Sequence, residues 1–209
     1  MPVTVEAPPP LDETARAILD AASQRFLHYG YGKTTMSEIA GDCNMSTGNL
    51  YRYFPSKLDI AEAFVRRLRT DQVKMLREAI SGEGQTTQEK LRTFFKTKLR
   101  LVYDRFHKRP KAYELSMEIL RERPAFADEW EKAEAHVLCS ILEFGELSGQ
   151  LAVCDRSRTA RILQDIFFRF TSSAVYYEGD YDILTGELDE VMDIVLDGFS
   201  YRKLNNSCI

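Results

Sequence analysis

The chain has 209 residues, a length that allows one or two domains with a sizeable core. Hydrophobic residues make up 44% of it and charged residues 29%, which is normal for a globular protein, and no run approaches the roughly 18 apolar residues of a membrane span. The formal net charge is −4, so the protein as a whole is not basic. Binding to a nucleic acid would therefore depend on a local surface with positive charge.

The cysteines and the N-terminal segment indicate a cytoplasmic protein. The four cysteines form no CxxC pair, so we expect independent reduced thiols. Residues 1–10, MPVTVEAPPP, lack the basic and apolar regions of a secretory signal, and their three consecutive prolines favour a stiff, solvated arm. We therefore expect a disordered arm over residues 1–10 and a cytoplasmic location.

A first helix is expected over residues 11–29. Gly30 is suited to end this helix in the left-handed conformation that glycine adopts at low cost. The predicted helix has one apolar face, formed by Ala15, Ile18, Leu19, Ala22 and Phe26.

Two short helices joined by a tight turn are expected next. Thr35 and Glu38 match a capping box, in which each side chain bonds a free amide of the first helical turn. Asn44 tolerates the left-handed conformation of a tight turn, and Ser46 can cap a second helix that begins at Thr47. Two helices across such a turn, the second rich in hydrogen-bonding side chains, are typical of a helix-turn-helix that reads the DNA major groove.

This segment resembles the DNA-binding domain of the TetR family of bacterial transcriptional regulators, over residues 11 to about 70. Two departures are visible: the usual Ala-Gly-Val of the turn is replaced by residues 43–45, Cys-Asn-Met, and Gly41 weakens the first short helix by roughly 1 kcal/mol. Asn44 is a reasonable substitute for the glycine of the turn. The matching features are Phe26, Gly30, the Thr34-Thr35 pair, Ile39-Ala40, Ser46, Gly48, Leu50-Tyr51, Tyr53-Phe54 and Lys57.

Sequence-specific binding to a palindromic, double-stranded DNA operator is therefore expected. No carboxylate lies from Asn44 through Leu58, so nothing acidic in this stretch repels the phosphate backbone. Gly48 allows close approach to the groove, and the neighbouring hydroxyl and amide groups can bond base edges or backbone. The predicted DNA-binding residues are Thr35, Ser46, Thr47, Gly48, Asn49, Tyr51, Tyr53 and Lys57, with Thr35 and Lys57 on phosphates.

The remainder of the chain is predicted to be helical. Ser56 and Asp59 form a second capping box and open a fourth helix that runs to about residue 80, where a glycine-rich hinge follows. We expect an all-α fold of about nine helices, with a three-helix DNA-binding head in residues 11–70 and a ligand-binding and dimerisation body in residues 71–209. The further helices are expected near 87–108, 111–122, 125–147, 156–177 and 187–203.

The last two predicted helices have more apolar surface than one interior contact needs. Residues such as Ile162 and Ile194 lie off the main apolar faces, and excess apolar surface on a helix usually meets a partner. An ordinary intrachain core is the alternative, whereas the family resemblance implies a homodimer built on these two helices. The predicted interface residues are Leu163, Ile166, Phe170, Ala174, Tyr177, Val191, Val195 and Phe199.

The middle helices contain a large set of apolar and aromatic residues. The resemblance implies a ligand cavity among them, although such residues at helical spacing are more often simple core. We expect a small, mostly apolar or aromatic effector. The predicted ligand-binding residues are Phe95, Leu99, Tyr103, Tyr113, Met117, Trp130, Phe167 and Phe170.

The stretch from Glu89 to Lys111 is strongly basic, with nine lysines and arginines against two acidic residues. One interpretation is a solvated helix whose charges pair with neighbouring acidic groups. The other is a positive rim that attracts an anionic effector or supports DNA from a distance.

The sequence as a whole predicts a homodimeric transcriptional repressor that a small ligand releases from its operator. A ligand-responsive activator is one alternative, and an all-α adaptor or enzyme is another. No P-loop, GxSxG, HExxH or dinucleotide motif is present, so we expect no catalytic residues and no cofactor. His136 and Cys139 lie one helical turn apart without a third ligand nearby, so no metal site is expected either.

Overall fold

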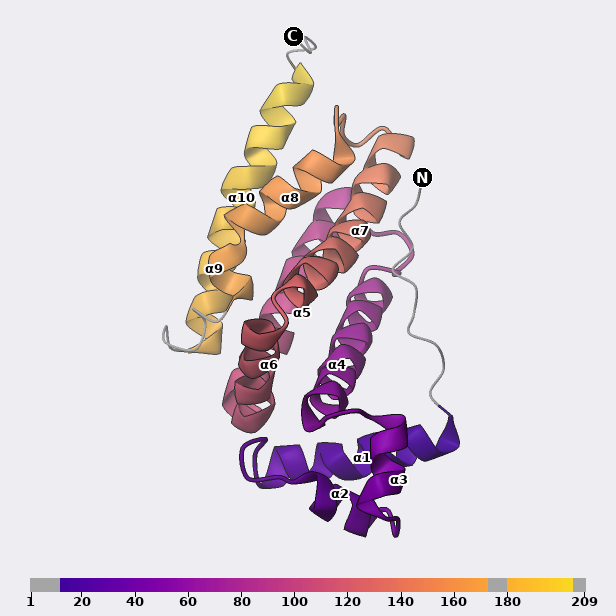
Figure 1. Ribbon diagram of the computed structural model, residues 1–209. Coiled ribbons are helices and arrows are strands. Elements are labelled where there is room, and N and C mark those ends of the chain that lie inside the picture. The colour runs from indigo at the N-terminus through magenta and orange to yellow at the C-terminus, as the bar shows by residue number, and fades with distance from the viewer. Residues whose placement is uncertain (1–11, 173–179, 205–209) are drawn as a thin grey trace. The chain divides into compact units, whose positions relative to one another are not determined.

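The structure, a computed structural model, describes residues 12–172 and 180–204, with side chains as far as Leu196. Within these residues it contains ten helices, nine of them seven residues or longer, and no strand, which confirms the all-α fold (Figure 1). Across the same residues, none of the helices combines the length and the apolar character that crossing a membrane requires. The helices are α1 (Glu13–His28), α2 (Met36–Asp42), α3 (Thr47–Tyr53), α4 (Lys57–Ala79), α5 (Thr87–Lys108), α6 (Pro110–Glu122), α7 (Ala125–Leu147), α8 (Arg156–Ile166), α9 (Phe168–Thr171) and α10 (Tyr181–Leu204).

The chain divides into two compact units. The first comprises Met1–Asp71 and Lys108–Trp130, and the second comprises Gln72–His107 and Glu131–Ile209, so that α4 and α7 contribute residues to both. The boundary between Asp71 and Gln72 lies next to the domain boundary expected at residue 70. The grouping of α6 with the N-terminal helices was not predicted from the sequence.

The first unit is organised around the apolar face of α1. Ile18 and Phe26 of α1, Ile39 of α2 and Leu50 of α3 are fully buried, as the periodicity of the sequence predicts. Gly30 ends α1 with a φ of 94°, which confirms the predicted left-handed cap. These buried side chains pack the three helices α1, α2 and α3 around one small core.

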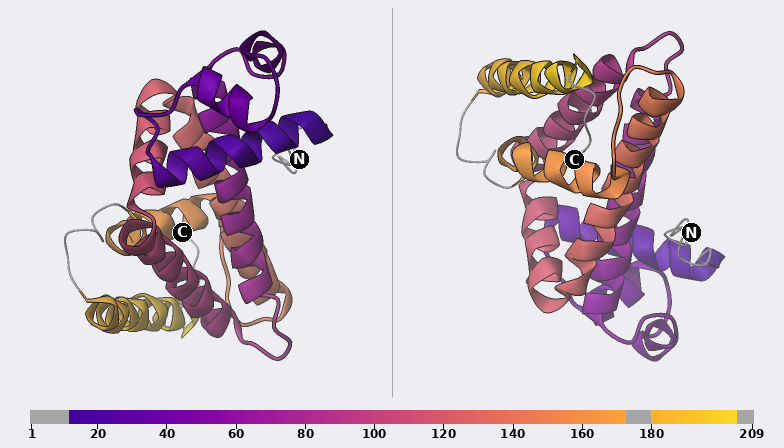
Figure 2. Two further views of the ribbon diagram at one scale, coloured as in Figure 1. Left: turned by 90° about the horizontal axis from the view of Figure 1, so that it is seen from below. Right: turned by 90° about the horizontal axis from the view of Figure 1, so that it is seen from above.

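The core of the second unit is aromatic. Phe94, Phe95 and Phe167 are fully buried, and the ring centroids of Phe95 and Phe167 are 4.1 Å apart. The helix α10 lies beside α5 at the edge of this unit (Figure 2), where Lys96 Nζ is 2.8 Å from Asp189 Oδ2. Arg92, Lys96 and Lys98 of α5 thus pair with acidic neighbours, as the interpretation of a solvated, paired helix expects for this part of the stretch.

The two C-terminal helices differ from the prediction. The helix expected over residues 156–177 is interrupted at Phe167, which leaves the helical conformation at φ −93° and ψ 10° and separates α8 from the short α9. The aromatic side chain of Phe167 packs against Phe95, and we infer that this burial outweighs helix continuation. The last helix begins at Tyr181 and not at residue 187, because the Asp180 carboxylate accepts a hydrogen bond from the Asp182 amide at 2.7 Å.

A buried polar cluster joins three helices of the second unit. Lys98 Nζ of α5 lies 2.6 Å from Glu134 Oε2 of α7, and both side chains are less than a tenth exposed. Gln72 of α4 donates from Nε2 to Glu134 Oε1 at 3.2 Å, and Arg105 donates to the Gln72 side-chain oxygen. Because the charges of Lys98 and Glu134 have lost most of their hydration, the attraction between them and the added hydrogen bonds must offset a large desolvation cost.

We expect Glu134→Leu to lower the free energy of unfolding by about 3–5 kcal/mol, because it leaves the ammonium of Lys98 buried without its partner. The double variant Lys98→Met/Glu134→Leu replaces the whole pair with apolar groups and should recover most of that loss. Chemical denaturation of the three proteins tests this. Equal destabilisation by the single and double variants would contradict the account, because it would mean that the unpaired charge is not the cause.

Candidate nucleic-acid interface

The helix α2 begins with the predicted capping box. The backbone amide of Thr35 donates to Glu38 Oε2 at 2.8 Å, and the amide of Glu38 donates to Thr35 Oγ1 at 3.3 Å. The hydrogen bonds from Thr35 hold the pKa of the Glu38 carboxyl below its usual range. The cap fixes the start of α2 and leaves Thr35 exposed there, where a phosphate contact is predicted.

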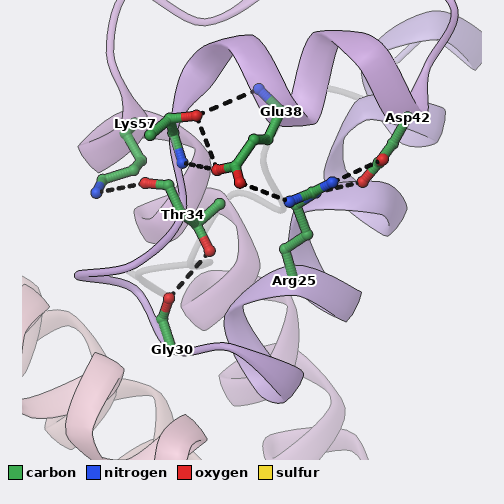
Figure 3. Close-up of polar contacts among 7 residues, drawn as sticks. Arg25, Gly30, Thr34, Glu38, Asp42 and Lys57 are labelled. Carbon is green, nitrogen blue, oxygen red and sulfur yellow. Dashed lines mark hydrogen bonds and ion pairs between the residues drawn. The ribbon is translucent and has the colours of Figure 1, made fainter.

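Arg25 of α1 holds α2 at both of its ends (Figure 3). Its Nη2 donates to Asp42 Oδ1 at 2.9 Å, and its Nη1 lies 3.3 Å from Glu38 Oε1. The hydrogen bonding from Arg25 lowers the pKa of the Asp42 carboxyl. Sequence reasoning missed this contact, because the partners are 13 and 17 residues apart and no local pattern links them.

The turn between α2 and α3 has the predicted geometry. Asn44 adopts a φ of 51°, which confirms the left-handed residue that replaces the usual glycine. The amide of Met45 donates back to the carbonyl of Ala40 at 3.0 Å, which closes the end of α2. Ser46 then accepts a hydrogen bond from the amide of Asn49 at 3.2 Å and caps α3, as expected.

The short helix α3 is anchored on one side and exposed on the other. Leu50 is fully buried and Phe54, which follows the last turn, is 6% exposed, so these two side chains hold the helix on the core. Tyr51 is half exposed, at 49%, although it is a large aromatic residue. The remaining predicted DNA-contact residues of α3 are Thr47, Asn49 and Tyr53, which are half-buried, and Gly48, which is exposed.

Gly48 is not required by the fold. A Cβ atom built at this position meets no heavy atom within 4 Å, and its backbone is helical. The same holds for Gly41 of α2. Glycine weakens a helix by about 1 kcal/mol relative to alanine, and the fold does not require it at either position. On the exposed side of α3, close approach to DNA is a reason for the glycine at position 48.

Lys57 fastens the loop between α1 and α2 to the start of α4 (Figure 3). Its Nζ donates to the carbonyl oxygen of Thr34 at 2.8 Å. The same Nζ donates to the carbonyl oxygen of Tyr31 at 2.8 Å and lies 4.3 Å from the centroid of the Tyr31 ring. Burial lowers the pKa of this ammonium group. The positioning role was not expected from the sequence, and the phosphate contact of Lys57 stays a prediction.

The predicted ligand-binding residues are divided between the two units. Phe167 packs between Phe95 and Phe170, with ring centroids 4.1 and 6.4 Å apart, and all three are buried. These side chains form part of the aromatic core of the second unit. Phe95, Leu99, Tyr103, Phe167 and Phe170 belong to the second unit, whereas Tyr113, Met117 and Trp130 belong to the first.

Two of the predicted dimer-interface residues lie in the core of the protomer. Leu163 and Phe170 are 1% and 2% exposed, so they belong to the core of the protomer and offer no surface to a second chain. Ile166 is 42% exposed and remains available. Ala174 and Tyr177 lie outside the described residues, as does the side chain of Phe199, while Val191 and Val195 are half-buried. The exposed apolar residues of α8, α9 and α10 are Ile162, Ile166, Phe168, Ile183 and Ile194.

Comparison with known proteins identifies two family models along the chain. Residues 18–64 match the bacterial regulatory proteins of the tetR family, and residues 87–192 match the tetracyclin repressor-like C-terminal domain. The second model alone spans about half of the chain.

Several individual proteins are similar to this one. The transcriptional repressor BepR of Brucella suis is 39% identical over 67 residues, which are 32% of each chain, so this match spans only about a third of that protein. The transcriptional repressor KstR2 of Rhodococcus jostii is 25% identical over 207 residues, 92% of this chain and 97% of its own. The structure of the Thermus thermophilus repressor FadR in complex with lauroyl-CoA aligns with a TM-score of 0.63 and 24% identity, covering 88% of this chain and 94% of that one.

We expect Gly48→Ala to leave the free energy of unfolding unchanged or to raise it by about 0.5–1 kcal/mol, since alanine favours the helix and its Cβ meets nothing. The same variant should bind the operator at least tenfold more weakly, because the added methyl would hold α3 away from the bases. Gly41→Ala is the matched control, with the same stabilisation expected and no comparable loss of affinity. DNA duplexes selected by the wild-type protein provide the operator, and full affinity of Gly48→Ala would contradict the assignment.

Proposed function

This chain belongs to the TetR family of bacterial transcriptional regulators, and we propose that it is a homodimeric repressor released from a palindromic operator by a fatty acyl-CoA, which combines an apolar acyl chain with an anionic CoA part. It is a DNA-binding regulator and not an enzyme. The observation that carries the proposal is α3, a capped helix anchored by Leu50, with an exposed Gly48 for which the fold gives no reason.

In the proposed complex, α3 enters the major groove of the operator. Thr47, Asn49 and the two tyrosines Tyr51 and Tyr53 offer hydroxyl and amide groups that can bond base edges or phosphates. One such helix contacts only a few base pairs. Two copies on a two-fold axis would place their recognition helices about 34–36 Å apart, or a multiple of that distance, and match a palindromic site.

The proposed dimer uses the exposed apolar residues of α8 to α10. Ile162 and Ile166 lie one helical turn apart on α8, and each is more than 40% exposed. Ile183 and Ile194 of α10 are exposed still further. Burial of these side chains against a second copy would remove an apolar surface that is unfavourable in water, with about 25 cal/mol gained for each Å² buried.

Two observations support the proposal that the effector is a fatty acyl-CoA. The second unit has a core rich in phenylalanine, of the kind that an acyl chain can enter when the side chains repack. The Thermus thermophilus FadR, which resembles this chain along most of its length, was solved with lauroyl-CoA. A long apolar chain attached to a polar group is therefore the effector that we propose.

The ligand can release the protein from DNA only if it binds one conformation of the protein more tightly than another, and if the conformation it prefers has the lower affinity for the operator. The helix α4 contributes residues to both units, and its Gln72 bonds the buried Glu134 of α7. A ligand that displaced α7 would therefore act on α4. A coupling of about 1–3 kcal/mol between ligand and operator is typical, and the coupling is the same in both directions.

We expect lauroyl-CoA to weaken operator binding about 5- to 150-fold, the range that corresponds to that coupling. Saturating operator DNA should weaken the binding of lauroyl-CoA by the same factor. Fluorescence anisotropy of labelled operator and calorimetric titration of the ligand measure the two factors. Equal ligand affinity with and without operator would exclude the release mechanism, even if lauroyl-CoA itself bound well.

We expect Ile166→Asp to convert the dimer to a monomer at micromolar concentration and to reduce operator affinity strongly, because a charge would be buried at the proposed interface. Its thermal stability as a monomer should change little, since the residue is 42% exposed within the protomer. Leu147→Asp on α7, which is even more exposed, is the control and should remain dimeric. A dimeric Ile166→Asp protein in sedimentation experiments would place the interface elsewhere.

A further inference from the structure

The second unit contains a groove that none of the predicted sites includes. It has a volume of about 450 Å³ and is formed by the end of α4, the segment that follows it, the beginning of α5 and one side of α7. Small-molecule sites typically have volumes of about 300–1,000 Å³, so the groove is large enough for a ligand. Three basic side chains line it, from Arg77, Lys90 and His136, and we call it the basic groove.

The charge of the basic groove is not balanced by nearby carboxylates. No acidic residue lines it, and among the described side chains of residues 12–172 and 180–196 no carboxylate forms an ion pair with Arg77, Lys90 or His136. This differs from the rest of α5, where Lys96 pairs with Asp189 and Lys98 with Glu134. The guanidinium of Arg77 and the ammonium of Lys90, which have no acidic partners around this hollow, favour an anionic ligand.

Lys90 is held in a fixed position inside the groove. Its Nζ donates to the carbonyl oxygens of Ile80 at 2.5 Å and Gly82 at 3.1 Å, and it lies 5.1 Å from the centroid of the Phe144 ring. The side chain is only 9% exposed, which is unusual for a lysine. A positive charge fixed in advance loses little conformational entropy when an anion binds.

The opposite wall of the groove is apolar and aromatic. Val137, Ile141 and Phe144 of α7 follow one another at spacings of four and three residues and therefore face the groove together. Phe144 is partly exposed, so one face of its ring can stack on a planar group. The hydroxyls of Ser81 and Ser140 add hydrogen-bonding groups at the rim.

We propose that the basic groove binds the phosphorylated adenosine end of a CoA thioester. Arg77, Lys90 and His136 contact the phosphates, and the Phe144 ring stacks on the adenine, an interaction worth about 1–3 kcal/mol for a base on an aromatic side chain. A free fatty acid fits less well, because it has one carboxylate and no planar group. The assignment rests on the proposed function in that it takes the effector to be an acyl-CoA, and it adds the residues that recognise the CoA part.

Calorimetric titration of the full-length protein with adenosine 3′,5′-bisphosphate, which carries no acyl chain, tests the groove directly. We expect this compound to bind the wild type, and Arg77→Glu to weaken both it and lauroyl-CoA at least tenfold. Lys74→Glu, three residues earlier on α4 and outside the groove, makes the same charge change and should bind both ligands as the wild type does. Circular dichroism melting curves verify that both variants fold.

The outcomes separate the groove from the proposed function. If lauroyl-CoA binds and releases the operator with the same affinity for the wild type and Arg77→Glu, the groove assignment is overturned while the regulator mechanism stands. If the bisphosphate binds in an Arg77-dependent way but lauroyl-CoA leaves the operator complex intact, the groove assignment is supported and the proposed effector fails. Inorganic phosphate that binds as tightly as the bisphosphate would also overturn the assignment, because the adenosine would then contribute nothing.

Discussion

The seven residues of α3 cannot form a stable helix by themselves in water, since nucleation is costly and isolated helices of fewer than about 12 residues are marginal. The helix exists because Leu50 and Phe54 are buried on one side of it and Ser46 caps its first turn. Every property proposed for DNA recognition depends on this anchoring. It leaves the other side of α3 open to a partner without loss of stability.

The contacts of Arg25 and Lys57 hold the elements around α3 in position. Arg25 bonds the first and last turns of α2, and Lys57 ties the preceding loop to the start of α4. Both use charged groups to bind other parts of the protein, so their charge is only partly available to phosphates. An acidic protein can still present a DNA-binding surface, because no carboxylate lies from Asn44 through Leu58 and the local arrangement of groups, more than the net charge, decides what faces the partner.

Charge is distributed differently in the second unit. Lys98 and Glu134 are buried together, whereas Arg77, Lys90 and His136 surround a groove without acidic partners. The first arrangement fixes the packing of α5 against α7, because moving either helix would separate two desolvated charges. The second leaves a positive potential that a ligand can neutralise. The same type of residue on α5 therefore stabilises the fold at one position and favours ligand binding at another.

The sequence by itself determined the features that depend on residues within about four positions of one another. The capping box of Thr35 and Glu38, the left-handed turn at Asn44 and the cap at Ser46 are local, and the structure has each of them as predicted. The apolar periodicity of α1 likewise identified its buried face. These features carry the family resemblance, and they were sufficient to predict the helix-turn-helix and the all-α fold.

The tertiary structure decided what depends on residues far apart in the chain. The interruption at Phe167 follows from its packing on Phe95, the two carbonyl partners of Lys57 lie 23 and 26 residues before it, and the basic groove combines three helices. Periodicity cannot distinguish Phe170, which is buried, from Ile166, which is exposed, because both satisfy the same helical pattern. Which face of a helix meets the core of its own chain is set by the neighbours that the fold places against it, and no short stretch of sequence contains those neighbours.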